Sequence, residues 1–115
     1  MQKVFFMFQI NKYKKKLVEL CDNNLVVNKL YFFGSVLSPK FDEEASDIDV
    51  LVEVTDLSPE ERGENLIVLW DNLELLFNRK VDLLTENSLR NPYFKREVEQ
   101  TKKLIYDRHS DKIFI

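Results

Sequence analysis

A gap of eleven residues separates a Gly-Ser pair from a strand that opens with two acids, and this arrangement constrains the fold more than any other feature. The first segment is Phe33-Gly34-Ser35, and the second is Asp47-Ile48-Asp49-Val50-Leu51-Val52. Because side chains alternate along a strand, Asp47 and Asp49 project to the same side, ~7 Å apart along the backbone. The sheet that contains this strand must therefore keep two carboxylates together on one face.

Hydrophobic periodicity changes several times along the chain and predicts an α+β fold, with a small mixed β-sheet flanked by helices in the order α-β-β-α-β-α. Ser58-Pro59-Glu60-Glu61 is typical of a helix start, with a serine cap, a proline in the first turn and acids beside the helix N-terminus. The predicted elements are a helix around Ile10–Leu20, strands Lys29–Phe33 and Ile48–Val54, a helix after Ser58 that carries the leucine stripe 66, 69, 73 and 76, a strand Lys80–Leu84, and a terminal helix from Asn91-Pro92 to Tyr106 whose Phe94, Val98, Thr101 and Ile105 share a face.

Length and composition indicate a single folded domain over residues 1–115. The chain is 44% hydrophobic and 32% charged, and its two Gly and three Pro leave no room for a long linker. A net charge of −3 argues against nucleic-acid binding driven by bulk electrostatics. No apolar segment is long enough to cross a membrane, and no signal peptide is expected. Cys21 is the only cysteine, which fits a reducing cytoplasm.

A third acid, Asp82, interrupts the apolar run Val81-Asp82-Leu83-Leu84, where a buried strand has little reason to carry a charge. The helix between the second and third strands provides a crossover, so these strands are expected to lie side by side and to bring Asp82 toward Asp49. Three carboxylates at close range repel one another unless a cation lies between them. Oxygen ligands favour Mg²⁺ or Mn²⁺, so the sequence predicts a metal site at Asp47, Asp49 and Asp82.

Gly34 and Ser35 are the candidate phosphate-binding residues. A strand that ends at glycine and enters a helical turn exposes backbone N–H groups to which phosphate oxygens can bind, and the serine hydroxyl adds a donor. With metal ions bridging a triphosphate and the carboxylates, the pattern predicts in-line attack of an acceptor hydroxyl and release of pyrophosphate.

At these residues the chain resembles the DNA polymerase beta-like nucleotidyltransferase superfamily, in particular its minimal nucleotidyltransferase (MNT) branch. The pattern of that branch is Gly-Ser, ten to twelve residues, Asp-x-Asp and a later Asp on a strand, and the resemblance covers about Lys29 to Thr85. The resemblance implies that Asp47 and Asp49 bind metal, that Asp82 completes the site and helps to deprotonate the acceptor, and that Gly34 and Ser35 hold the triphosphate of ATP.

Minimal members of this superfamily are often antitoxins of small helical HEPN ribonuclease toxins, and some transfer AMP from ATP to a tyrosine of the toxin. The resemblance therefore implies a Mg²⁺-dependent protein adenylyltransferase with a HEPN partner. Two alternatives stay open: a non-catalytic antitoxin that acts by contact, and an enzyme that modifies RNA ends or a small molecule. The first alternative has a basis in the sequence, because relatives often carry an Arg and a Gly soon after Gly-Ser, whereas Lys40 is the only base of residues 36–41 here.

Large apolar side chains gather at both ends of the chain, where most domains fray. They are Phe5, Phe6 and Phe8 at one end and Ile113, Phe114 and Ile115 at the other. These side chains either add to the domain or dock on another chain, and the second interpretation includes a homo-oligomer.

Overall fold

The computed structural model describes the backbone of residues 2–37 and 47–110, and the side chains of residues 11–34, 36–37 and 47–110. The apolar side chains at the two ends of the chain, for which association was expected, lie outside the described residues, as does Lys40. The elements in chain order are α1 (Gln2–Asp22), β1 (Val27–Phe33), the 3-10 helix η1 (Gly34–Leu37), β2 (Ile48–Val54), α2 (Pro59–Phe77), β3 (Val81–Thr85), the 3-10 helix η2 (Glu86–Ser88), α3 (Pro92–Thr101) and β4 (Lys103–Asp107).

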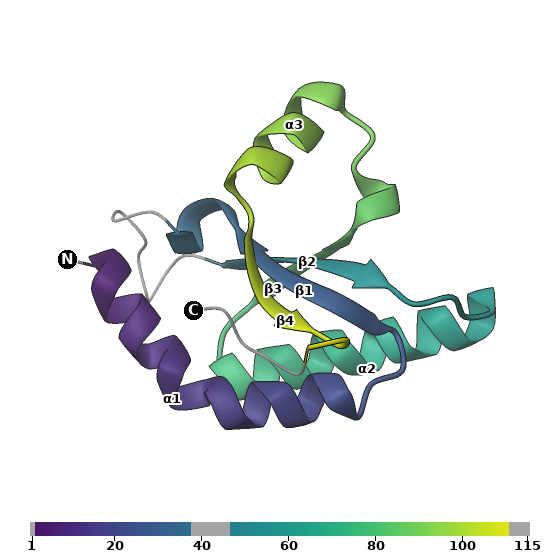
Figure 1. The fold of residues 1–115 in the computed structure, drawn as a ribbon, viewed down its shortest axis with the longest axis horizontal. Helices are drawn as coiled ribbons and strands as arrows, with labels where there is room; N and C mark the ends of the chain where they lie inside the picture. The colour runs from purple at the N-terminus through teal and green to yellow at the C-terminus, as the bar shows by residue number, and fades with distance from the viewer. Residues whose placement is uncertain (1, 38–46, 111–115) are drawn as a thin grey trace.

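The described strands form one mixed sheet in the order β3-β2-β1-β4 (Figure 1). β1 pairs antiparallel with both β2 and β4, whereas β2 and β3 are parallel and are joined by α2 as a crossover. The predicted α+β class, the mixed sheet and the order α-β-β-α-β-α are confirmed, and β4 follows as an additional strand.

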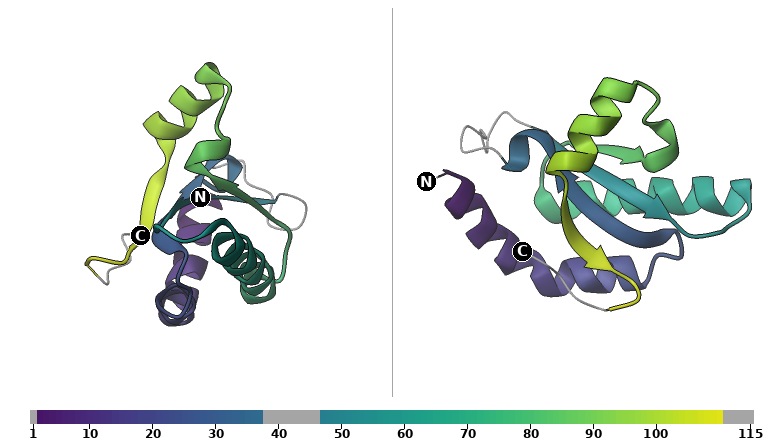
Figure 2. Two further views of the ribbon diagram at one scale, coloured as in Figure 1. Left: turned by 90° about the vertical axis from the view of Figure 1, so that its right-hand side faces the viewer. Right: turned by 45° about the horizontal axis from the view of Figure 1, so that its top comes forward.

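The two faces of the sheet are covered by different helices. α1 and α2 lie along one face, and α3 stands against the other face near one end (Figures 1 and 2). Strand alternation divides the core accordingly. In β1 and β2, even-numbered side chains such as Leu30 and Val50 pack with α1 and α2, whereas Phe33 and Leu51 pack with Val98 of α3. In β3 the numbering is offset by one residue, because Asp82 pairs with Asp49, so both acids lie on the α3 face of the sheet.

α2 begins as its sequence predicts and is bonded to the edge of the sheet. The Ser58 hydroxyl accepts from the backbone N–H of Glu61, and Asn78 ends the helix in the left-handed conformation, with φ 51°. Trp70 Nε1 donates to the carbonyl of Val81 at 2.7 Å, and Glu74 Oε2 accepts from the N–H of Val81 at 2.9 Å. These bonds satisfy backbone groups on the outer edge of β3 and fix where β3 starts.

The predicted terminal helix is wrong in its last turn. α3 begins at Pro92, with Asn91 as its cap, but it ends at Thr101, and the chain continues as β4. Lys102 leaves the helix with extended backbone, at φ −58° and ψ 145°, and Ile105 then lies in the strand and not on the helix face. The free edge of β1 accounts for the change, because Tyr31 pairs with Leu104 and Phe32 with Lys103.

In the part of the chain that the structure describes, no helix combines the length and hydrophobicity needed to cross a bilayer.

Candidate active site

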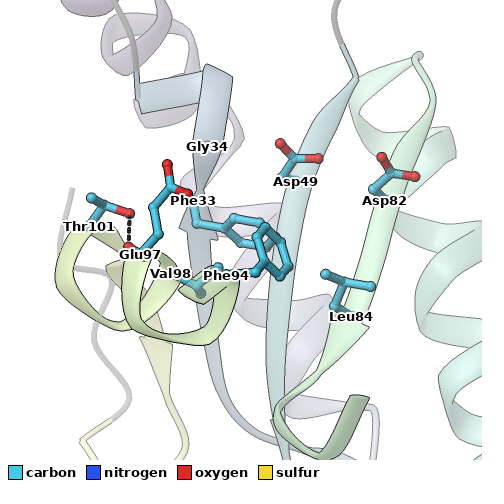
Figure 3. A pocket seen from close by; sticks show the side chains of 9 residues that line it. All are labelled: Phe33, Gly34, Asp49, Asp82, Leu84, Phe94, Glu97, Val98 and Thr101. Carbon is cyan, nitrogen blue, oxygen red and sulfur yellow. Dashed lines mark hydrogen bonds between the residues drawn. The ribbon is translucent and has the colours of Figure 1, made fainter. Parts of the chain in front are cut away.

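Asp49 and Asp82 are partners in the parallel ladder between β2 and β3. On its other side Asp49 pairs with Phe33, the last residue of β1. Since the two acids occupy the same register position on neighbouring strands, their side chains leave the sheet on the same face, and Figure 3 shows the two carboxylates beside each other. The crossover argument from the sequence therefore predicted this juxtaposition correctly.

Gly34 brings its backbone against the carboxylate of Asp49. It has a φ of +72°, and a Cβ at this position would overlap Asp49 Oδ2. Only glycine adopts this conformation without strain and leaves the space open. η1 begins at Gly34 itself, so the expected passage from strand into helical turn is present beside the acids. The side chain of Ser35 lies outside the described residues.

A cavity of about 440 Å³ opens beside the two acids, between the sheet and α3 (Figure 3). Phe94 lies edge-on to Phe33 on its apolar side, with ring centroids 6.2 Å apart, and Glu97 extends toward the cavity from α3. The lining residues are Phe33, Gly34, Asp49, Asp82, Leu84, Phe94, Glu97, Val98 and Thr101. The α3 wall was not identified from the sequence: Phe94, Val98 and Thr101 were predicted to share a helix face, but nothing in the sequence connected that face with the acids.

Asp47, the third candidate acid, differs from the other two in its contacts. It directly precedes β2, is not among the cavity-lining residues, and has Oδ2 4.0 Å from Lys80 Nζ. Within residues 2–37 and 47–110, no group of three His, Cys, Asp or Glu side chains is arranged to hold a metal ion. The structure therefore pairs Asp49 with Asp82 across the two strands and gives Asp47 an ion-pair partner in Lys80.

The fold and this arrangement agree with a family comparison. The model of the nucleotidyltransferase domain family matches residues 11–105. This chain belongs to that family. The match includes the Gly34 turn, both acid-bearing strands and α3, so every residue that lines the cavity lies within the family domain.

Several putative protein adenylyltransferases of Methanocaldococcus jannaschii are similar over most of their length. One is 33% identical over 98 residues, which cover 85% of this chain and 94% of the relative. Another is 36% identical over 97 residues, which cover 84% of this chain and 89% of the relative.

Solved structures of toxin-antitoxin complexes contain the same fold. One complex, crystallised with AMP-PNP, matches at 24% identity with a TM-score of 0.58, covering 85% of this chain and 77% of the matched chain. A second, in which a tri-AMPylated HEPN toxin of Shewanella oneidensis is bound to an MNT antitoxin, matches at 24% identity with a TM-score of 0.56, covering 88% and 75% of the two chains. At this identity the likeness establishes the fold of the nucleotidyltransferase domain.

The donor set of the cavity suits a hard divalent cation. Asp49, Asp82 and Glu97 contribute carboxylates to the lining, and none of the described residues that line it is a Lys or an Arg. Mg²⁺ is usually bound by one or two protein carboxylates together with substrate phosphates and water, so the adjacent pair Asp49 and Asp82 is sufficient on the protein side. The carboxylates and the close backbone approach at Gly34 thus fit a magnesium-bound triphosphate.

A second polar cluster lies on the same face, farther along the sheet. Lys102 Nζ lies 4.3 Å from the centroid of the Tyr31 ring. Burial, and then the nearby carboxylate of Glu53, raise the pKa of Glu86, an effect that Lys102 and Lys95 partly offset. Burial and the same Glu53 also raise the pKa of Tyr31. This cluster joins the end of α3 to the sheet and so supports the α3 wall of the cavity.

Proposed function

We propose that this protein is a Mg²⁺-dependent adenylyltransferase that transfers AMP from ATP to a tyrosine hydroxyl of a HEPN ribonuclease toxin and thereby acts as an antitoxin in the cytoplasm. The observation that carries the proposal is the register pairing of Asp49 with Asp82 beside the backbone of Gly34. The names of the relatives support protein adenylylation, and the neighbouring toxin-antitoxin complexes support the choice of partner.

Each residue of the site has a distinct role in this reaction. Backbone N–H groups of η1, which starts at Gly34, bind phosphate oxygens of ATP, and the hydroxyl of Ser35 is the proposed additional donor. Asp47, Asp49 and Asp82 are the proposed metal ligands. Bound Mg²⁺ would supply charge neutralisation at the triphosphate. The apolar rings of Phe33 and Phe94 exclude water from one side of the cavity.

The chemical step is a displacement at the α-phosphorus. The acceptor oxygen forms a bond to this phosphorus, the bond from the α-phosphorus to the oxygen that bridges to the β-phosphorus breaks, and pyrophosphate leaves with the bonding electrons. Asp82 lies on the edge strand of the described sheet and its side chain is exposed, so we assign to it the role of accepting the acceptor's proton.

The test follows the label from ATP. The chain, Mg²⁺ and the candidate HEPN partner are incubated with ATP labelled at the α-phosphate or, separately, at the γ-phosphate, and the proteins are analysed by mass spectrometry. We expect the α-label and a mass of AMP on a tyrosine of the partner, and no transfer of the γ-label. Asp49→Asn and Asp82→Asn should abolish transfer, whereas Asp71→Asn, which changes an exposed acid of α2, should not.

Other outcomes distinguish the alternatives. Full neutralisation of the toxin by Asp49→Asn, with no label on either protein, would overturn the enzymatic proposal in favour of an antitoxin that acts by contact. Label that appears only on RNA ends would replace the proposed protein acceptor with RNA.

A further inference from the structure

A second hollow, of about 300 Å³, lies between the first turns of α2, η2 and the end of β2. Its lining residues are Val54, Arg62, Leu66, Thr85, Asn87, Ser88 and Arg90. Val54 follows Asp49 by five residues and Thr85 follows Asp82 by three, so at about 3.3 Å per strand residue the hollow lies on the order of 10–17 Å from the acid pair. It shares no lining residue with the cavity of the active site.

The charge of this hollow is opposite to that of the chain. Of the described residues that line it, two are arginines and none is an acid, although the protein has a net charge of −3. Among the described residues, the Arg62 and Arg90 side chains make neither an ion pair nor a hydrogen bond, so both guanidinium groups keep their donors for a ligand. Two guanidinium groups that face one hollow without a carboxylate leave it electropositive and selective for anions.

The backbone that carries these side chains is held in place from both sides. Ser88 Oγ donates to the carbonyl of Thr85 at 2.7 Å and accepts from its N–H at 3.2 Å, which closes η2 on itself. Leu89, between Ser88 and Arg90, is buried in the core under α3. Arg62 lies in the capped first turns of α2, with its N–H bonded to the carbonyl of Ser58 at 2.8 Å. Because the backbone around the hollow is already fixed, the protein loses little conformational entropy there when a ligand binds.

We propose that this hollow is a binding site for the phosphate group of a small molecule, separate from the catalytic cavity. A planar guanidinium group can donate two parallel hydrogen bonds to two oxygens of one phosphate. The carboxamide of Asn87, which also lines the hollow, adds a neutral donor. Val54 and Leu66, which pack on the core, line the hollow with apolar side chains. These side chains have no acceptor atoms that could occupy the arginine and asparagine donors in place of a phosphate. The volume accommodates phosphate or pyrophosphate, which are the simplest ligands that carry this group.

The test is a titration of the full chain, followed by backbone amide NMR without divalent metals and at constant ionic strength. The probes are inorganic phosphate, pyrophosphate and, as a carboxylate, acetate. We expect saturable shifts at the amides of Arg62, Asn87, Ser88 and Arg90 with the two phosphate probes. Arg62→Gln and Arg90→Gln should each weaken binding about tenfold. Arg62→Lys should weaken it less, because lysine keeps the positive charge and loses only the paired, planar donors of the guanidinium group.

Matched variants make the result decisive. Arg96→Gln removes an exposed arginine from α3, outside the hollow, and should bind phosphate as the parent chain does. Asp49→Asn should also bind phosphate in the hollow unchanged, so failure of the proposed catalysis and failure of this site are separate results. Shifts confined to residues around Gly34, equal binding of acetate, or binding that Arg62→Gln and Arg90→Gln leave intact would each overturn the proposal.

Discussion

Trp70 of α2 donates its indole N–H to the carbonyl of Val81, the residue directly before Asp82. Glu74, one helical turn later, accepts from the N–H of the same residue. β3 is an edge strand of the described sheet, so these backbone groups have no neighbouring strand to bond to on that side. The side chains of Trp70 and Glu74 supply the hydrogen bonds that a further strand would make. The position of Asp82 relative to Asp49 therefore depends on α2 as well as on the ladder.

Trp70→Phe removes the indole N–H and keeps an aromatic ring. We expect the free energy of unfolding to fall by about 1 kcal/mol, because the carbonyl of Val81 loses its partner, and kcat/KM for AMP transfer to fall because Asp82 is held less firmly. Urea denaturation and transfer assays measure the two effects. Leu75→Ala, at a residue of α2 that is 79% exposed, is the control and should change neither by a measurable amount. Equal behaviour of the two variants would show that the clamp on Val81 has no effect.

Most of the fold could be predicted because local signals and tertiary packing agree. The cap at Ser58, the leucine stripe of α2 and the strand that follows Asp47 each specify one element, and a parallel pair with a helical crossover is the natural way to join them. β4 could not be predicted in this way. Ile105 continues the helical spacing of Phe94 and Val98, and no Gly or Pro marks the change, so only the unpaired edge of β1 determines that these residues form a strand.

The candidate site also has some features that the sequence predicts and others that it does not. The pairing of Asp49 with Asp82 follows from strand order, and the glycine turn from its position at the end of β1. The α3 wall depends on how a short helix docks on the sheet, which is a tertiary property that the pattern of Phe94 and Val98 leaves open. The ion pair of Asp47 with Lys80 likewise depends on the approach of two loop ends that are distant in sequence.

Glu86→Gln tests the polar cluster beneath α3. Burial and Glu53 raise the pKa of Glu86 above its ordinary value of 4.5, so the folded state holds the proton more tightly than the unfolded state does. The free energy of unfolding of the parent chain should therefore fall as the pH rises through the raised pKa. Glu86→Gln lacks this titration, and we expect it to be more stable at pH 7 by about 0.5 kcal/mol or less, since Glu86 is exposed and screened, and equal to the parent below about pH 4.

The double variant with Glu53→Gln provides the control for this prediction. With the Glu53 charge removed, the stabilisation by Glu86→Gln at pH 7 should shrink, because the repulsion between the carboxylates of Glu53 and Glu86 is then absent from both chains that are compared. Thermal unfolding is measured from pH 3.5 to 8 for the parent, Glu86→Gln, Glu53→Gln and the double variant. A gain in stability from Glu86→Gln that persists unchanged at low pH would contradict the assigned cause.

Cys21 is fully buried, and burial, followed by the charge of Asp22, raises the pKa of its thiol to about 12. The folded protein should therefore react with a thiol reagent at pH 8 only as fast as it unfolds, whereas the denatured chain should react at once. Because the thiol of the unfolded chain ionises near 9.0, the free energy of unfolding should also fall between pH 9 and 12. Rapid labelling of the folded chain, followed by mass spectrometry, would contradict the burial of this residue.

Gly34→Ala tests the contact on which the catalytic proposal depends most directly. Alanine would have to adopt a φ of +72°, at a cost of roughly 1–2 kcal/mol, and its Cβ would displace the carboxylate of Asp49. We expect the free energy of unfolding to fall by about that amount and calorimetric binding of ATP with Mg²⁺ to be lost. Gly63→Ala is the matched control, because a Cβ there meets nothing within 4 Å and α2 should gain roughly 0.5–1 kcal/mol from the better helix former. ATP binding by Gly34→Ala at the parent affinity would show that the close approach of Gly34 to Asp49 does not form the nucleotide site.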